Sequence, residues 1–285
     1  MTGPSSATHT TRSIRGVLFL VVIMSTVNIR RADAQMGDST HISDDRRFLR
    51  PRELAALGTG LAAAGALSLA DVRIARWDQS AGVQGGSGRA RFFKDVTKVN
   101  ETTITVAGLA AYGIGRVFHA EAFTDVAKHT TEAVLFTSLV SQAIRGPLGR
   151  TRPYVTRDSN QYDFHLGKGF TSFDNRAWPS LHSATAFAAG SALVAELGER
   201  HPTAMPWAAP LIYAAAAMPG LSRMYLDQHW ASDVLAGDVL GAVLGSRLVH
   251  YAHSAPAGGL PRWLAAMTVV PTVGGGVSLA VTVQQ

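Results

Sequence analysis

The chain contains no cysteine. Disulfide bonds, thiolate nucleophiles and cysteine-ligated zinc or iron–sulfur centres are therefore excluded, although this absence does not by itself indicate a cellular compartment. Charge is also scarce, because only 16% of the 285 residues are charged whereas 47% are hydrophobic. A chain of this length and composition can form one sizeable core, alone or with short appendages.

Basic runs interleaved with aromatic residues are absent as well. The formal net charge of the chain is +6, and residues 1–34 contribute half of it. A modest positive charge without such a run is not typical of a nucleic-acid-binding protein. We therefore expect no nucleic-acid partner, and the sequence leaves the oligomeric state open.

Residues 1–34 have the layout of a signal peptide. Arg12 and Arg15 precede an apolar run over 16–27, which is too short to span a bilayer comfortably, and Ala32–Ala34 forms an A-x-A cleavage pattern. Two arginines between the run and the cleavage pattern are unusual, so an uncleaved anchor or an unstructured leader is the alternative. We expect an exported protein of the periplasm or cell envelope, with its active site on the extracytoplasmic side.

The rest of the chain divides into a flexible lead-in (35–50), a helical domain (51–255) and a tail (256–285). Within the domain, apolar stretches rich in small residues predict helices at about 54–70, 102–118, 130–144, 183–197, 204–221 and 234–250. Most are 15–18 residues long, at or below the length that spans a bilayer, so a soluble bundle and an integral membrane bundle both remain open.

Three segments have special composition. Pro206, Pro210 and Pro219 are expected to kink or break the stretch 204–221. The glycine-rich segment 82–91 does not follow a predicted strand, so we interpret it as a flexible loop and not a nucleotide-binding loop. In the tail, hydrophobic residues alternate over 269–283 around three consecutive glycines, a pattern that predicts a short β-hairpin.

Polar residues gather in the stretch LSRMYLDQHWASDVLAG, residues 221–237. His229 and Asp233 are four positions apart, so a helix would place them on one face within side-chain reach. A carboxylate that bonds one ring nitrogen leaves the other free as a base, nucleophile or ligand. Alone, such a pair is more often structural. Arg223 is expected in a turn leading to this helix.

Two further clusters precede this one. Ser180 and His182 stand at a predicted helix start, where free backbone N–H groups and the helix dipole attract anions. Arg145, Arg150 and Arg152 crowd into eight residues, and forked guanidinium donors suit phosphate. A plain helix cap and a solvated basic loop are the alternatives. Together, the three clusters predict one pocket for a phosphoryl dianion, with two histidines to attack and to protonate the leaving group.

These clusters resemble the three signature motifs of the type-2 phosphatidic acid phosphatase and vanadium haloperoxidase superfamily. The first motif is a basic residue, six residues and Arg-Pro, here Arg145, GPLGRT and Arg152-Pro153. The second is Pro-Ser-Gly-His, here Pro179-Ser180-Leu181-His182. The third is Ser-Arg, five residues, His, three residues and Asp, here Ser222-Arg223, His229 and Asp233. Three motifs in order are specific, whereas each alone would be weak.

The resemblance implies a fold and a role for each residue. The fold would be an all-α bundle of about six core helices, with the hairpin appended. His229 would attack phosphorus to form a phosphohistidine, Asp233 would orient its ring, and His182 would protonate the leaving oxygen and then activate water. The phosphoryl oxygens would be bound by Arg145, Arg152, Arg223, Ser180 and the backbone N–H of Leu181.

Two positions depart from the family pattern. Arg145 stands where Lys is common and keeps the charge. Leu181 stands where Gly is usual, which would be costly if the backbone there needs a positive φ. A helical backbone at this position would tolerate leucine.

The function expected from this resemblance is a metal-independent phosphatase acting on phosphomonoesters or pyrophosphates. Lipid phosphates are the expected substrates, with membrane association, and vanadate is the expected inhibitor. The alternatives are a vanadate-dependent haloperoxidase, in which vanadate would be the cofactor, and a non-catalytic envelope protein that binds lipid phosphate. A metal site at His229 and Asp233 is disfavoured, because no third ligand has a supporting spacing and the arginines would repel a cation.

Overall fold

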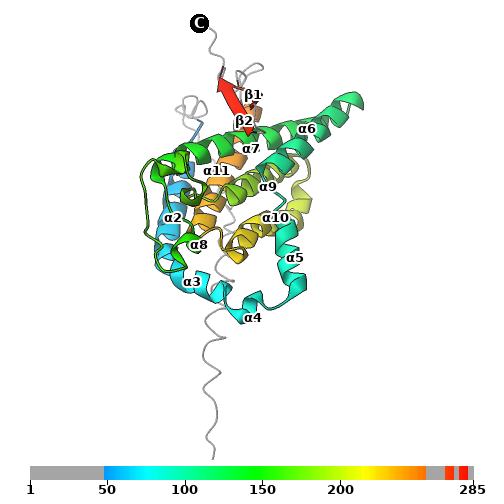
Figure 1. The fold of residues 1–285 in the computed structure, drawn as a ribbon. Coiled ribbons are helices and arrows are strands. Elements are labelled where there is room, and N and C mark those ends of the chain that lie inside the picture. The colour runs from blue at the N-terminus through cyan, green and yellow to red at the C-terminus, as the bar shows by residue number, and fades with distance from the viewer. Residues whose placement is uncertain (1–47, 255–266, 273–275, 282–285) are drawn as a thin grey trace, which may run out of the picture.

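The computed structural model describes residues 48–254, 267–272 and 276–281 (Figure 1). The predicted signal peptide and most of the predicted lead-in therefore lie outside the described residues. Helices dominate the described part, which confirms the all-α prediction. The six long helices correspond to the six apolar stretches of the sequence and are α2 (Pro51–Ser68), α6 (Glu101–Val117), α7 (Glu121–Leu148), α9 (Leu181–Arg200), α10 (Met205–Tyr225) and α11 (Ala231–Ser254).

Shorter helices connect the long ones. They are α3 (Asp71–Asp78), α4 (Ala81–Gln84), α5 (Ser87–Val96) and α8 (Pro153–Thr156), with 3₁₀ turns at Lys168–Phe170, Phe173–Asn175 and Pro202–Ala204. Because α4 and α5 occupy most of the glycine-rich segment 82–91, the loop prediction there is wrong. Only Gly85 and Gly86 remain between the two helices.

The prolines of α10 do not end the helix. Pro206 lies in the first turn, where its missing N–H has no intrahelical acceptor to lose. Pro210 and Pro219 are inside the helix, which nevertheless continues to Tyr225. The predicted break at 204–221 is therefore wrong, and packing of α10 against α9 accompanies the continuous helix.

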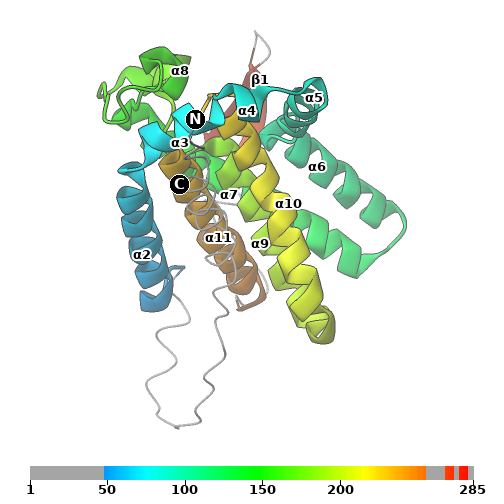
Figure 2. The same cartoon turned by 90° about the horizontal axis from the view of Figure 1, so that it is seen from below.

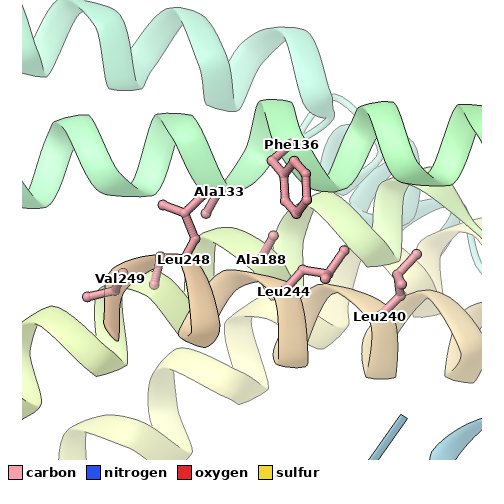
Figure 3. Packing of buried hydrophobic residues seen from close by; sticks show 8 residues of the cluster. Ala133, Phe136, Ala188, Leu240, Leu244, Leu248 and Val249 are labelled. Atoms are coloured by element: carbon pink, nitrogen blue, oxygen red, sulfur yellow. The ribbon is translucent and has the colours of Figure 1, made fainter. Parts of the chain in front are cut away.

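The centre of the bundle lies between α7, α9 and α11. Figure 3 shows Phe136 and Ala133 of α7 directed toward Leu244 and Leu248 of α11, with Ala188 of α9 beside them. These residues are buried and form one apolar cluster. The three helices that carry most of the predicted site residues therefore share a single core.

Close contact between α9 and α11 sets the position of the site. Gly237, Gly241 and Gly245 form a stripe on α11 that faces the backbone of α9. A Cβ atom on Gly241 would lie 2.1 Å from a backbone oxygen of α9, so no larger residue fits without moving the helices apart. The contact brings the N-terminal ends of both helices together, where the Ser180 N–H donates to the Asp233 carbonyl at 2.9 Å.

Two strands follow the bundle. β1 (Met267–Thr272) and β2 (Gly276–Val281) pair antiparallel, with Met267 opposite Val281 and Thr272 opposite Gly276. The connecting residues 273–275 lie outside the described residues, so the predicted hairpin turn stays a prediction.

A single helix must meet a requirement of length and apolar composition to cross a bilayer. Taken singly, the helices of the described ranges all fall short of it. The consecutive pair α2 and α3 meets the requirement together, although the two are bent by 66° at their junction.

Candidate active site

Five segment ends meet at one end of the bundle. Arg145 lies in the last turn of α7, Arg152 caps α8, and Ser180 caps α9. Arg223 is in the last turn of α10, so the sequence-based expectation of a turn there is wrong. His229 precedes α11 by two residues. Figure 2 shows α3 lying across the same end, next to the start of α11.

Three arginines line the site. Arg145 and Arg152 are buried and Arg223 is partly buried. The side-chain oxygen of Gln228 accepts hydrogen bonds from both Arg152 and Arg223 at 3.1 Å and so holds these two guanidinium groups together. Burial, with repulsion from neighbouring arginines, lowers the pKa of Arg145 to about 9 and those of Arg152 and Arg223 to about 10. All three remain cationic at neutral pH.

Each arginine is also anchored by the protein. Arg145 donates to the Arg176 carbonyl at 2.7 Å, and Arg152 donates to the Phe173 carbonyl at 3.1 Å while its guanidinium lies 4.0 Å from the centre of the Phe173 ring. Among the described residues, the Nε atoms of Arg145 and Arg223 are buried without a hydrogen-bond partner. Buried donors without an acceptor are costly, and an oxyanion would satisfy them.

Both histidines lie within this positive field. Burial, followed by the charges of Arg223, Arg145 and Arg152, lowers the pKa of His182 to about 3. Burial and the same arginines lower the pKa of His229 well below its usual value, and His182 adds to the effect. Both imidazoles are therefore neutral at pH 7. A neutral imidazole is the form that can attack an electrophile, and a bound dianion would make protonation of its neighbour easier.

Asp233 is fixed by several donors. Its Oδ2 accepts the Trp230 N–H at 2.9 Å and lies 3.5 Å from His229 Nδ1, and its Oδ1 accepts from Arg150 at 2.5 Å. Burial raises the pKa of Asp233 to about 6 against the opposing attraction of Arg150, so the carboxylate is ionised at neutral pH. The His229–Asp233 pairing expected from the sequence is thus present as a close approach, although His229 lies outside the helix.

Arg150 is not available to a phosphate group. Its guanidinium donates to Asp71 at 2.9 Å as well as to Asp233, and it is buried between these two carboxylates. Asp71 of α3 also accepts the Ser232 N–H at 2.9 Å. The sequence-based grouping of Arg150 with the phosphate-binding arginines is therefore wrong. Its charge is neutralised by carboxylates, and its place is behind Asp233.

The second motif forms the start of α9. Ser180 is fully buried as the N-cap, and its Oγ faces the Ser183 N–H at 3.5 Å. Leu181 is the first residue of the helix and has no positive φ, so the leucine is accommodated without backbone strain. His182 follows in the first turn, where backbone N–H groups lack intrahelical acceptors.

Sequence reasoning missed three residues of the site. Gln228 bridges two arginines and stands next to His229 in the chain, which was the available signal. Thr97 accepts from Arg223 at 3.2 Å, and Asp71 supports Arg150. Nothing in the local sequence of Thr97 or Asp71 indicates these contacts, because both partners are more than seventy positions away.

The depressed pKa of His182 predicts a pH-dependent loss of stability. Between about pH 6.5 and 3 the unfolded chain takes up a proton at this residue and the folded chain does not, so the free energy of unfolding decreases as pH falls. The loss at pH 5 is about 2 kcal/mol. His182→Gln removes it, so the melting temperature of the variant relative to wild type should rise between pH 8 and pH 5. His250→Gln, at an exposed histidine, is the control. A pH-independent difference for His182→Gln would contradict the burial of a neutral imidazole.

The family model of the PAP2 superfamily matches residues 128–256, which include all three clusters. Residues 128–256 of the chain belong to the PAP2 superfamily. The matched segment runs from within α7 to the end of α11, so the PAP2 domain contains every site residue predicted from the sequence, whereas Asp71 and Thr97 precede it.

Several relatives of this PAP2 protein carry a more specific name. It is 41% identical over 69 residues to the lipid A 1-phosphatase of Porphyromonas gingivalis, and this stretch is 24% of the chain and 15% of the relative. It is 31% identical over 111 residues to the lipid A 1-phosphatase of Rhizobium johnstonii, which is 38% of the chain and 41% of the relative. The chain therefore spans less than half the length of these curated relatives.

A solved structure also matches. It is a transmembrane PAP2 type phosphatidylglycerolphosphate phosphatase from Bacillus subtilis, with 19% sequence identity and a TM-score of 0.36. The match covers 67% of this chain and 96% of the other.

Proposed function

We propose that this PAP2 protein is a metal-independent phosphatase that hydrolyses phosphomonoester or pyrophosphate groups of lipid phosphates through a phosphohistidine. The observation that carries the proposal is the set of three arginines, two of them with an unsatisfied buried donor, around two neutral histidines. Binding of an anion alone needs only the arginines. A positioned carboxylate behind one imidazole, and a second imidazole close by, add the groups that acid–base and nucleophilic catalysis require.

The proposed reaction has two steps. Binding of the phosphate dianion offsets the arginine charges, so His182 takes up a proton in the complex. With its Nδ1 turned toward Asp233, His229 presents Nε2 to phosphorus; an N–P bond forms while the ester P–O bond breaks, and protonated His182 transfers its proton to the leaving oxygen. Water then attacks the phosphohistidine, His182 takes its proton, and the N–P bond breaks to release orthophosphate. His182 thus returns to its starting protonation state.

Arginines supply the charge stabilisation in both steps. The transferred phosphoryl group spreads negative charge over its equatorial oxygens, and Arg145, Arg152 and Arg223 would bind them together with the N-terminal N–H groups of α9. These donors are held by protein contacts and need little reorganisation during the reaction. We therefore propose no metal or organic cofactor for the chemistry.

A lipid substrate is supported by the surface beside the site. The segment that connects α8 to α9 holds Phe173 against Arg152, and its exposed residues include Leu166, which is 80% exposed, and Phe170, which is 62% exposed. Apolar side chains that remain in contact with water near a polar pocket suit the acyl region of a lipid or a bilayer surface. The curated relatives are named lipid A 1-phosphatases. We propose membrane association with export through residues 1–34, and an active site on the extracytoplasmic side.

A phosphate-release assay tests this function. The purified chain, presented with phosphatidic acid, phosphatidylglycerol phosphate, isoprenyl pyrophosphate, lipid A and soluble phosphoesters, is expected to release orthophosphate fastest from a lipid. EDTA should leave the initial rate unchanged, and vanadate should inhibit competitively because it imitates the five-coordinate phosphorus.

Other outcomes separate the alternatives. Halide oxidation that depends on vanadate and peroxide, without phosphate release, would identify a haloperoxidase. Lipid-phosphate binding without turnover of any ester would identify a non-catalytic binding protein. Either result would overturn the phosphatase proposal.

A further inference from the structure

A second polar cluster lies at the other end of the same three helices. His129 of α7, Glu196 of α9 and His253 of α11 each offer one ligand atom, and these three atoms lie within 4.8 Å of one another. A single carboxylate oxygen, Glu196 Oε1, contacts His129 Nδ1 and lies 2.9 Å from His253 Nε2. Glu196 and His182 are fourteen positions apart on α9, which corresponds to about 21 Å along the helix. The cluster is therefore separate from the phosphate site.

Three side chains surround the carboxylate of the cluster. Glu196 is fully buried and is contacted by His129, His253 and Arg200. Arg200 contacts the other oxygen, Glu196 Oε2, and is itself paired with Asp125 at 3.2 Å. The positive charge of Arg200 is thus offset, while Glu196 Oε1 remains directed at the two imidazoles.

We propose that His129, Glu196 and His253 bind one divalent transition-metal cation with the preferences of Zn²⁺. Two imidazole nitrogens and one carboxylate oxygen form a common set of protein ligands for zinc. Tetrahedral coordination with bonds of about 2.0–2.2 Å places ligand atoms about 3.3–3.6 Å apart, so the contacts of Glu196 with the two histidines need only a small expansion. The His253 side chain is 41% exposed, which leaves room for a water as fourth ligand and gives the ion a path from solvent.

The consequence would be structural. Each ligand comes from a different helix of the central α7, α9 and α11 core, and all three lie far from the reacting groups. A cation would therefore cross-link the core helices and stabilise the fold, because an ion that binds only the folded state raises its stability. It would take no part in phosphate hydrolysis.

Zinc content and thermal stability test the site without an activity assay. The full chain, purified without a histidine tag and dialysed against Zn²⁺ and then metal-free buffer, should retain about one zinc per chain. Its melting temperature should be higher with Zn²⁺ than after EDTA. His253→Ala should lose both the bound zinc and the zinc-dependent rise. His253 is partly exposed, so this variant is expected to fold.

His250→Ala is the matched control. His250 lies three positions earlier on α11, is exposed and bonds the Ser246 carbonyl at 2.7 Å, so this variant should behave as wild type. Glu196→Gln is a second variant that should also lose zinc. The proposal is overturned if wild type binds no zinc, or if His253→Ala retains as much as wild type. Neither result would count against the proposed phosphatase activity, because that activity is tested separately by phosphate release.

Discussion

His229→Ala is expected to lower kcat for phosphate release by about 10⁵- to 10⁶-fold, the scale seen when a covalent nucleophile is removed. The ring is buried among three arginines, with Nδ1 turned to Asp233. The measurement is single-turnover hydrolysis of a labelled lipid phosphate, followed by trapping of the protein in acid-free conditions. Wild type should yield a phosphohistidine, and the variant should yield none.

Two further variants complete this test, a control at His250 and a change of the proposed proton donor His182. His250→Ala, a histidine-to-alanine change far from the site, should leave the rate unchanged. His182→Ala should still form the phosphohistidine from an ester with a very good leaving group, because such a group departs without a proton. Labelled protein in His229→Ala, or a rate within tenfold of wild type, would disprove the nucleophile assignment.

The second large effect is expected for Asp233→Asn, which should lower kcat by about 10³- to 10⁴-fold with little change in KM. The amide nitrogen would face either Arg150 or His229 as a donor facing a donor, so the imidazole would lose the carboxylate that fixes its tautomer. The substrate contacts, which belong to the arginines, would remain. Steady-state kinetics across the acid limb of the pH profile measure both quantities.

Asp95→Asn is the matched control for this substitution. Asp95 forms an exposed ion pair with Lys98 at 2.7 Å and contacts none of the predicted catalytic residues. Because exposed ion pairs contribute little, Asp95→Asn should change kcat by less than twofold. A comparable small effect for Asp233→Asn would show that the carboxylate supports the fold and not the imidazole.

The six long helices could be predicted from the sequence because each is a continuous apolar stretch. The site residues could be grouped because they belong to three motifs with fixed spacing along the chain. Sequence patterns failed where the outcome depends on partners far away in sequence. Arg150 and Arg152 are the same residue type two positions apart, yet one is paired with carboxylates of α3 and α11 while the other faces the site. The carboxylates of Asp71 and Asp233 distinguish them, and both lie far away in the sequence.

Two other features could not be predicted from the sequence patterns either. Pro210 and Pro219 predict a break in isolation, and the helix continues because tertiary packing outweighs the lost backbone bonds. His129, Glu196 and His253 are separated by more than fifty residues and have no common motif, so only the packing of three helices side by side brings them together.

The crowding of guanidinium groups has a consequence for the end of the catalytic cycle. Without an anion between them, Arg145, Arg152 and Arg223 repel one another at a buried location where water screens poorly. Orthophosphate relieves that repulsion as well as an ester does, so the cleaved product is itself a good ligand. Release of orthophosphate, and not cleavage of the ester, would then be the rate-limiting step, and accumulating orthophosphate would inhibit turnover.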